Sequence, residues 1–208
     1  MDERLLLWIN QGWGHPALDG VFWWLSQRFW FAFPLAALLL YDSVRRRGRD
    51  GARLFVLLAL TVACGDVLGG FLKDGFAEPR PCQALFEQLR ALGGALAERC
   101  GTALNGMPSN HALNFFAAAT FVAIATPWRG WRIGLFVCAV LVGLSRIYLG
   151  KHYPSQVVAG AWVGTLVGAF GAWLALRYPT VFKIPAASAD WLGSSPAVNR
   201  ERDEANRS

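Results

Sequence analysis

The sequence predicts an all-α fold: a polytopic membrane helix bundle of about five transmembrane helices, preceded by a short N-terminal interfacial helix. Of the 208 residues, 54% are hydrophobic, only 16% are charged and ten are Trp, which is too apolar for a soluble domain of this length. The apolar residues also form long runs. Residues 54–72 contain one charged side chain, Asp66, and residues 157–176 contain none. Such runs match the ~20 residues that a helix needs to cross a bilayer core.

Residues 1–20 are predicted to form the interfacial segment. They begin with acidic residues and have an apolar core of only five residues, which does not fit a secretory signal peptide. A short amphipathic helix in the outer membrane interface fits better, with Trp8 and Trp13 in the aromatic belt.

The transmembrane domain is predicted to extend over residues 21–176. Its five apolar runs cover residues 21–41, 54–72, 111–127, 133–149 and 156–176. Gly160, Gly164 and Gly168 form a stripe at intervals of four in the last run, which either close packing inside the monomer or dimerisation would explain. The sequence shows no internal repeat and no second domain.

Basic residues predict how the bundle is oriented. They are concentrated in residues 43–53, in residues 127–132 and just after residue 176, segments that alternating spans place on one side. The positive-inside rule makes that side cytoplasmic and the loop 73–110 periplasmic. The net charge of +6 is explained by this placement and does not indicate nucleic-acid binding. The polar residues 177–208 are predicted to be a disordered cytoplasmic tail.

Polar side chains gather at the opposite, outer ends of the spans, where the insertion rule disfavours basic groups. Positive charges and forked N–H donors suit phosphate oxygens, and a helix that starts near Pro108 would add its backbone N–H groups. Two neighbouring imidazoles could attack phosphorus and protonate the leaving oxygen. The outer residues are Lys73, Arg80, Ser109, His111, Ser145, Arg146 and His152.

Three segments resemble the signature of the type 2 phosphatidic acid phosphatase superfamily: Lys-x6-Arg-Pro, Pro-Ser-Gly-His and Ser-Arg-x5-His-x3-Asp. The spacing agrees in all three, and the resemblance covers roughly residues 54–176. In this chain the segments are Lys73…Arg80-Pro81, Pro108-Ser109-Asn110-His111 and Ser145-Arg146…His152…Gln156.

The resemblance implies a role for each matching residue. His152 would be the nucleophile that forms a phosphohistidine, and His111 the general acid. The residues that would bind the phosphate are Lys73, Arg80, Ser109, Asn110, Ser145 and Arg146. Family members work without a metal or cofactor, and this sequence has no Asp-x-Asp pair or carboxylate and histidine cluster at ligand spacing.

Two positions depart from the family pattern. Asn110 replaces Gly, which is a mild change because Asn tolerates unusual backbone angles. Gln156 replaces the Asp that would accept a proton from the nucleophilic ring and stabilise its cation. Gln can accept the same hydrogen bond but carries no charge, so we expect a slower enzyme rather than an inactive one.

Three further residues have open alternatives. Asp66 is expected to pair with a basic or histidine partner inside the bundle, or to be protonated, because a charge at that depth costs roughly 2.5–3.5 kcal/mol. Cys82 and Cys100 could form a disulfide in an oxidising outer compartment, or could be two free thiols.

The sequence therefore predicts a metal-independent lipid phosphatase of a bacterial inner membrane, with its active site facing the periplasm. Its partners would be the bilayer and a lipid phosphate, and the family implies undecaprenyl diphosphate, phosphatidylglycerol phosphate, phosphatidate or lipid A phosphates. Two alternatives remain: a phosphotransferase that passes the phosphoryl group to a second lipid, and a non-catalytic lipid-phosphate binder or transporter, suggested by Gln156. The oligomeric state stays open.

Overall fold

The structure, a computed structural model, describes residues 1–90 and 102–178, and this part of the chain contains helices and no strands. Three helical stretches in it are long and apolar enough to cross a membrane: Arg28–Ala84, Arg129–Tyr148 and Pro154–Arg177. The predicted all-α membrane bundle is therefore confirmed. The helices are α1 (Asp2–Gly12), α2 (Pro16–Leu25), the π-helical turn η1 (Arg28–Ala32), α3 (Phe33–Phe76), α4 (Pro81–Ala84), α5 (Asn110–Ala125), α6 (Arg129–Tyr148) and α7 (Pro154–Arg177).

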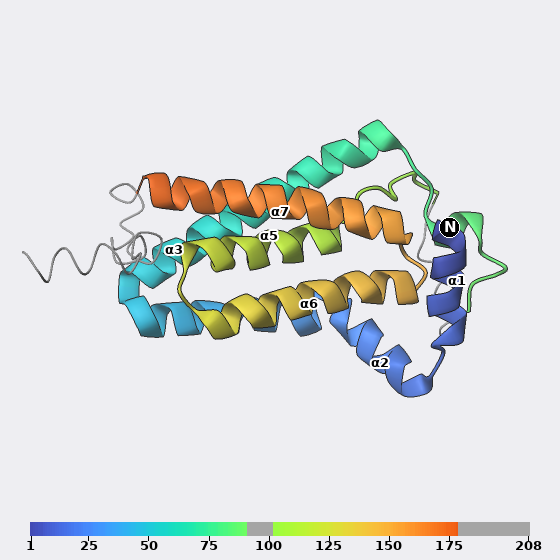
Figure 1. Cartoon of the computed structure of the whole chain (residues 1–208), viewed down its shortest axis with the longest axis horizontal. Coiled ribbons are helices and arrows are strands. Elements are labelled where there is room, and N and C mark those ends of the chain that lie inside the picture. The colour runs from blue at the N-terminus through green and yellow to red at the C-terminus, as the bar shows by residue number, and fades with distance from the viewer. Residues whose placement is uncertain (91–101, 179–208) are drawn as a thin grey trace, which may run out of the picture.

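Helix α3 consists of two arms that meet at Gly48. This residue has φ 56° and ψ −130°, a backbone conformation that favours glycine. The arms touch beside the break, because a Cβ on Gly51 would lie 2.0 Å from the backbone oxygen of Ser43. Figure 1 shows the arms diverging from this point. The arms correspond to the first two predicted spans, and the Arg-rich segment between them is largely helical.

A second break separates α2 from η1. Helix α2 ends at Leu25, and the chain turns through Ser26 and Gln27 before it becomes helical again. The predicted boundary at residue 20 thus falls inside α2, and the first predicted span is not one continuous helix.

Helix α5 lies between α6 and α7 (Figure 1) and contacts both, as well as α3. The glycine stripe of α7 allows the closest of these approaches. A Cβ on Gly160, Gly164 or Gly168 would lie 2.2–2.4 Å from a backbone oxygen of Ser109 or α5. Packing inside the monomer therefore explains the stripe.

The predicted cytoplasmic segments come together at one end of the bundle. The guanidinium of Arg47 lies 5.5 Å from the ring centre of Trp128, and Trp131 Nε1 donates a hydrogen bond of 2.7 Å to Asp42. Helix α7 ends at the same end of the bundle (Figure 1). The ends of α3 and α6 and the starts of α5 and α7 consequently meet at the opposite end.

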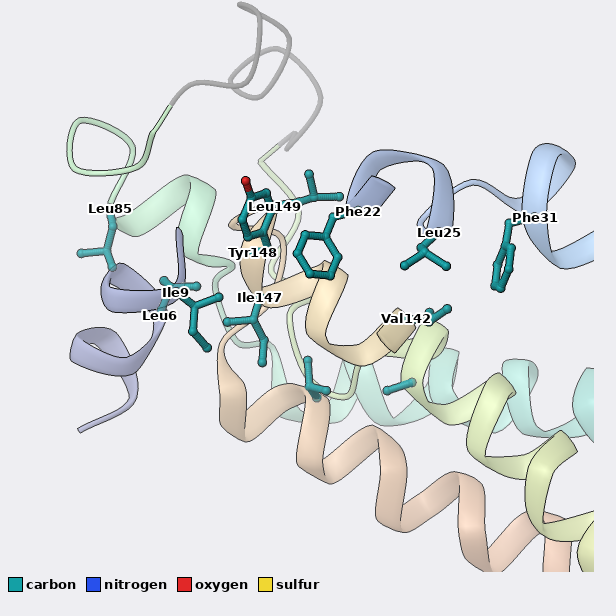
Figure 2. Packing of buried hydrophobic residues seen from close by; sticks show 12 residues of the cluster. Leu6, Ile9, Phe22, Leu25, Phe31, Leu85, Val142, Ile147, Tyr148 and Leu149 are labelled. Carbon is teal, nitrogen blue, oxygen red and sulfur yellow. The ribbon is translucent and has the colours of Figure 1, made fainter. Parts of the chain in front are cut away.

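Helices α1 and α2 lie across this opposite end (Figure 1). Their apolar side chains form a cluster with the last turn of α6, in which the rings of Phe22 and Tyr148 are 4.5 Å apart (Figure 2). The buried Asn10 side chain donates to the backbone oxygen of Tyr148 at 2.7 Å. The N-terminal segment thereby supports the turn that follows α6.

Candidate active site

The turn between α6 and α7 places His152 beside Arg146. Gly150 adopts φ 62°, so the chain folds back immediately after α6. The backbone N–H groups of Lys151 and His152 then donate to the backbone oxygen of Arg146, at 2.9 and 3.2 Å. The five residues between Arg146 and His152 in the motif are therefore the end of α6 and the turn that brings His152 back beside Arg146.

The His152 ring is buried, with 2% exposure, and is held at its Nδ1 atom. This nitrogen lies 2.8 Å from the backbone oxygen of Gly106 and 3.2 Å from Gln156 Oε1. Both partners are acceptors, so Nδ1 carries the hydrogen and Nε2 keeps a lone pair. The ring is in the tautomer that a nucleophilic Nε2 requires.

Gln156 is fully buried in the first turn of α7, and its amide orientation is determined by four neighbours. Its Oε1 also accepts from the backbone N–H of Tyr153 at 3.2 Å. Its Nε2 donates to the backbone oxygen of Pro79 at 3.0 Å and to Glu78 Oε2 at 3.3 Å. The amide oxygen is thus directed toward His152, the orientation that the predicted role of Gln156 requires.

Gly106 and Glu78 are site residues that sequence analysis missed. A Cβ on Gly106 would lie 2.5 Å from Gln156 Nε2 and 2.7 Å from the backbone oxygen of Pro79, so only glycine fits. The Gly106 N–H donates to the backbone oxygen of Glu78 at 2.8 Å. The Asn105-Gly106 dipeptide is a turn signal directly before the Pro-Ser motif and could have identified this position.

Three cations surround the His152 ring. Burial, followed by the charges of Arg146, Arg80 and Lys73, holds the pKa of His152 well below its usual value. The ring is therefore neutral at neutral pH before a substrate enters. The Nε atoms of Arg80 and Arg146 are buried without a hydrogen-bond partner among the described residues. A buried N–H without a partner costs about 1–3 kcal/mol, which an incoming anion would relieve.

The break between α2 and η1 contributes three more groups to the site: the hydroxyl of Ser26, the backbone of Ser26 and the charge of Arg28. The Arg146 guanidinium donates from Nη1 to the Ser26 hydroxyl. The backbone of Ser26 is a hydrogen-bonding neighbour of the His111 ring, and the charge of Arg28 acts on the same ring. Sequence analysis missed both residues, although Arg28 interrupts an otherwise apolar run and could have marked the break.

His111 lies in the first turn of α5, half-buried, and lines a cavity of about 400 Å³. The charges of Arg146 and Lys73 act on His111 as they do on His152. The two histidines therefore share one end of the bundle and one set of cations, as the sequence predicted.

The two predicted serines differ in their surroundings. Ser109 is fully buried at the start of α5, its backbone N–H donates to the Gln156 backbone oxygen at 3.0 Å, and its hydroxyl has no partner among the described residues. The Ser145 hydroxyl instead donates to the Val142 backbone oxygen of its own helix at 2.6 Å. Ser109 remains a phosphate-binding candidate, whereas the O–H of Ser145 is already used within α6.

Asn110 and Asp66 also differ from expectation. The Asn110 amide donates to Asp66 Oδ1 at 3.0 Å, so its side chain points into the bundle and not toward a phosphate. Asp66 Oδ1 accepts a second hydrogen bond from Asn114 at 2.8 Å. Within the described residues Asp66 forms no ion pair at contact distance, although its charge acts on Lys73. Its side-chain hydrogen bonds come instead from two amides on the face of α5 that packs against α3.

The predicted disulfide is only partly within the described residues. Cys82 is buried, with 4% exposure, and the free thiols in the described part of the chain are Cys64 and Cys138. Cys100 lies outside the described residues, so the disulfide stays a prediction. No group of three or more His, Cys, Asp or Glu side chains in the same part of the chain could hold a metal ion.

Comparisons with known proteins show which family and which proteins this chain resembles. The PAP2 superfamily model matches residues 52–179. A lipid A 4'-phosphatase of Porphyromonas gingivalis is 26% identical over 201 residues, which cover 94% of this chain and 78% of that protein. A lipid A 1-phosphatase of Rhizobium johnstonii is 36% identical over 64% of this chain and 48% of its own length. The crystal structure of Aquifex aeolicus LpxE has a TM-score of 0.55 and 27% identity, covering 82% of this chain and 93% of that one.

Proposed function

Because this chain belongs to the PAP2 superfamily, we propose that it is an integral-membrane phosphatase that removes phosphate from a lipid phosphate or diphosphate without a metal. One observation carries the proposal. The His152 Nδ1 atom is occupied by two acceptors, while three cations surround the ring, so Nε2 is the atom that can reach a bound phosphoryl group.

In the first half-reaction, the lone pair of His152 Nε2 forms a bond to phosphorus as the bond from phosphorus to the lipid oxygen breaks. His111, whose protonated form is favoured once the negatively charged phosphate of the substrate has bound beside it, gives its proton to that leaving oxygen. Arg80, Arg146 and Lys73 stabilise the negative charge that the transition state spreads over the phosphoryl oxygens. The products are a phosphohistidine and a lipid alcohol. When the substrate is a diphosphate, a lipid monophosphate is formed in place of the alcohol.

In the second half-reaction, water attacks the phosphohistidine and the neutral His111 accepts a proton from it. The bond from nitrogen to phosphorus breaks, its electron pair returns to Nε2, and inorganic phosphate leaves. Together the two halves consume one water for each phosphate released.

The site is proposed to face the periplasm of a bacterial inner membrane. The Arg-rich break of α3 lies at the other end of the bundle, and the positive-inside rule makes that end cytoplasmic. The organisms of the two phosphatase relatives are bacteria, which agrees with this location.

The test is release of inorganic phosphate by detergent-purified protein from a panel of phosphorylated lipids, with and without EDTA. We expect hydrolysis of at least one lipid, no loss with the chelator, and a loss of at least 10³-fold for His152→Ala, which removes the nucleophile. The matched control is His15→Ala, because His15 is exposed at the start of α2.

Other outcomes would decide between the alternatives. A phosphorylated second lipid in place of free phosphate would identify a phosphotransferase. A protein that binds lipid phosphates and releases nothing would be a binder, as the missing charge at Gln156 allows.

A further inference from the structure

The cavity beside His111 is an apolar, partly open groove that continues from the catalytic end toward the middle of the bundle. It lies between the arms of α3 and helix α5. Leu35, Leu39, Leu58, Val62 and Phe115 form most of its apolar wall. Its volume of about 400 Å³ and its opening at a catalytic histidine make it a place for the hydrocarbon of a lipid whose phosphate lies at the site.

Two polar side chains interrupt the apolar lining below His111. Asp66 and Asn114 both line the groove. Asn114 follows His111 by three residues and Asp66 precedes Lys73 by seven. At ~1.5 Å rise per residue, they lie roughly 5–10 Å below the phosphate-binding residues.

These two side chains present acceptors that the protein does not use. Asp66 Oδ1 accepts from the amides of Asn110 and Asn114, and no hydrogen bond reaches Asp66 Oδ2 within the described residues. The Asn114 Oδ1 atom is buried and has no partner within residues 1–90 and 102–178. Acceptors without donors in an apolar groove are unfavourable, and a ligand with N–H or O–H groups would satisfy them.

The candidate lipids differ in such donors. A polyprenyl diphosphate has only hydrocarbon beyond its phosphates, and a diacylglycerol phosphate offers ester oxygens, which are acceptors themselves. A phosphorylated amino sugar with N-linked hydroxyacyl chains carries amide N–H and hydroxyl groups within a few bonds of its phosphate. Phosphatidylglycerol phosphate has one glycerol hydroxyl, which lies in the headgroup directly beside its terminal phosphate. Among these classes, only the phosphorylated amino-sugar lipid carries amide N–H and hydroxyl donors at the start of its acyl chains.

We propose, on the basis of the function proposed above, that this groove binds the acyl part of a phosphorylated N-acyl amino-sugar lipid and that Asp66 and Asn114 recognise its amide and hydroxyl donors. A purely structural role is the alternative, since Asp66 also holds Asn110 at the start of α5. That role would affect all substrates equally, whereas recognition affects the donor-bearing lipid more.

The decisive variant is Asp66→Asn, which keeps the size of the side chain and removes its charge and one acceptor. We measure kcat/KM for a mono-phosphorylated N-(3-hydroxyacyl)glucosamine lipid and for a phosphatidate of the same chain length. We expect the loss with the glucosamine lipid to exceed the loss with phosphatidate by about tenfold or more, the usual cost of a hydrogen bond to a charged group. Equal losses with both lipids would overturn the proposal.

A second pair of variants tests the groove itself. Ala59 lines the groove and Leu60, its neighbour on α3, is 58% exposed outside it. Ala59→Phe should lower kcat/KM for the long-chain lipid about tenfold more than for para-nitrophenyl phosphate, which has no chain. Leu60→Phe should leave both values unchanged. An Ala59→Phe effect that is the same for both substrates would contradict chain binding in the groove.

Binding separates this inference from the proposed function. If the wild-type protein releases phosphate from no lipid of the whole panel, the phosphatase proposal fails. The affinities of the two lipids for the wild-type protein and for Asp66→Asn then decide the groove proposal. Tighter binding of the glucosamine lipid that Asp66→Asn abolishes supports the proposal, and equal affinities contradict it.

Discussion

At the residue scale, Gln156 stands where the family has Asp, and two further groups support it: the Gly106 carbonyl and the Glu78 carboxylate. The Gly106 carbonyl is closer to His152 Nδ1 than the Gln156 oxygen is, so the tautomer does not depend on position 156 alone. The carboxylate of Glu78 contacts the Nε2 end of the Gln156 amide. Orientation of the ring is thus preserved, and within residues 1–90 and 102–178 no carboxylate forms a hydrogen bond with it.

Gln156→Asp should raise turnover of a lipid phosphate at neutral pH. A carboxylate next to Nδ1 stabilises the cationic ring that forms as phosphoryl transfer proceeds, and rate effects at this kind of position reach about 10⁴-fold. The introduced charge would lie close to Glu78, so the double variant Glu78→Gln/Gln156→Asp should gain more than the single one.

The pH profile of kcat/KM tests the same argument independently of the rate. Burial and three cations lower the pKa of His152. Its Nε2 atom is therefore protonated, and unable to attack phosphorus, only below pH 6.5. Its acidic limb should therefore lie below pH 6.5, and Gln156→Asp should move that limb to higher pH because the carboxylate favours the imidazolium. A limb that stays in place would contradict this account.

Gly106→Ala should lower kcat by about 10²-fold while the protein stays folded. The added Cβ would collide with the Gln156 amide and the Pro79 carbonyl, and a shift of about 1 Å in a positioned group can cost this factor. Gly70→Ala is the matched control, because a Cβ there meets no atom within 4 Å. Circular dichroism and thermal unfolding check the fold, and an unchanged kcat would show that Gly106 does not position the ring.

At the element scale, α5 and α7 form a unit that holds both histidine-containing motifs. Their contact has almost no side chain between the backbones, since Gly164 faces the backbone of Leu113 and Gly168 that of Ala117. Ser109 caps the start of α5, His111 lies in the first turn of α5, and Gln156 lies in the first turn of α7. The separation of these two helices therefore sets the geometry of the site.

Gly164→Ala should destabilise the protein by about 1–3 kcal/mol, the usual cost of overpacking. Its Cβ would lie 2.2 Å from the Leu113 carbonyl, which is backbone and cannot rotate away. Gly134→Ala in α6, where a Cβ meets nothing within 4 Å, should be neutral. Thermal unfolding in detergent measures both, and activity of Gly164→Ala should fall with stability. Equal stability of the two variants would mean that α5 and α7 can move apart to accommodate the added methyl group without loss of folding free energy.

At the scale of the whole molecule, the orientation proposed for the bundle can be tested by labelling. Ser155 is exposed at the catalytic end and Arg49 at the Arg-rich end. In a background in which all four native cysteines are replaced by Ala, a membrane-impermeant maleimide should label Ser155→Cys in intact spheroplasts and Arg49→Cys only after lysis. The reverse pattern would place the site on the cytoplasmic side.

Sequence patterns predicted those features that depend on interactions between residues close together in the chain. Long apolar runs predict helices in a bilayer because the backbone must satisfy its own hydrogen bonds there. Motif spacing likewise predicted that His152 and Arg146 meet, because one tight turn at Gly150 joins them. These features need no knowledge of how distant helices pack.

Other parts of the site depend on contacts that cross the bundle. Ser26 lies 120 residues from Arg146, and Gly106 lies 46 residues from His152, and neither stands in a recognised motif. The inward rotation of Asn110 follows from where Asp66 lies on a neighbouring helix, and the hydroxyl of Ser145 is taken by its own α6 backbone.

The amino-acid sequence by itself determined the class of this protein, the approximate spans, the basic end of the bundle and the motifs that contain His111 and His152, because composition, hydropathy and spacing act through neighbouring residues. Tertiary structure alone decided which groups hold the His152 ring, which way Asn110 points and where an apolar groove meets unused acceptors. Those features arise from the rotation and separation of packed helices, which depend on side chains far apart in the chain.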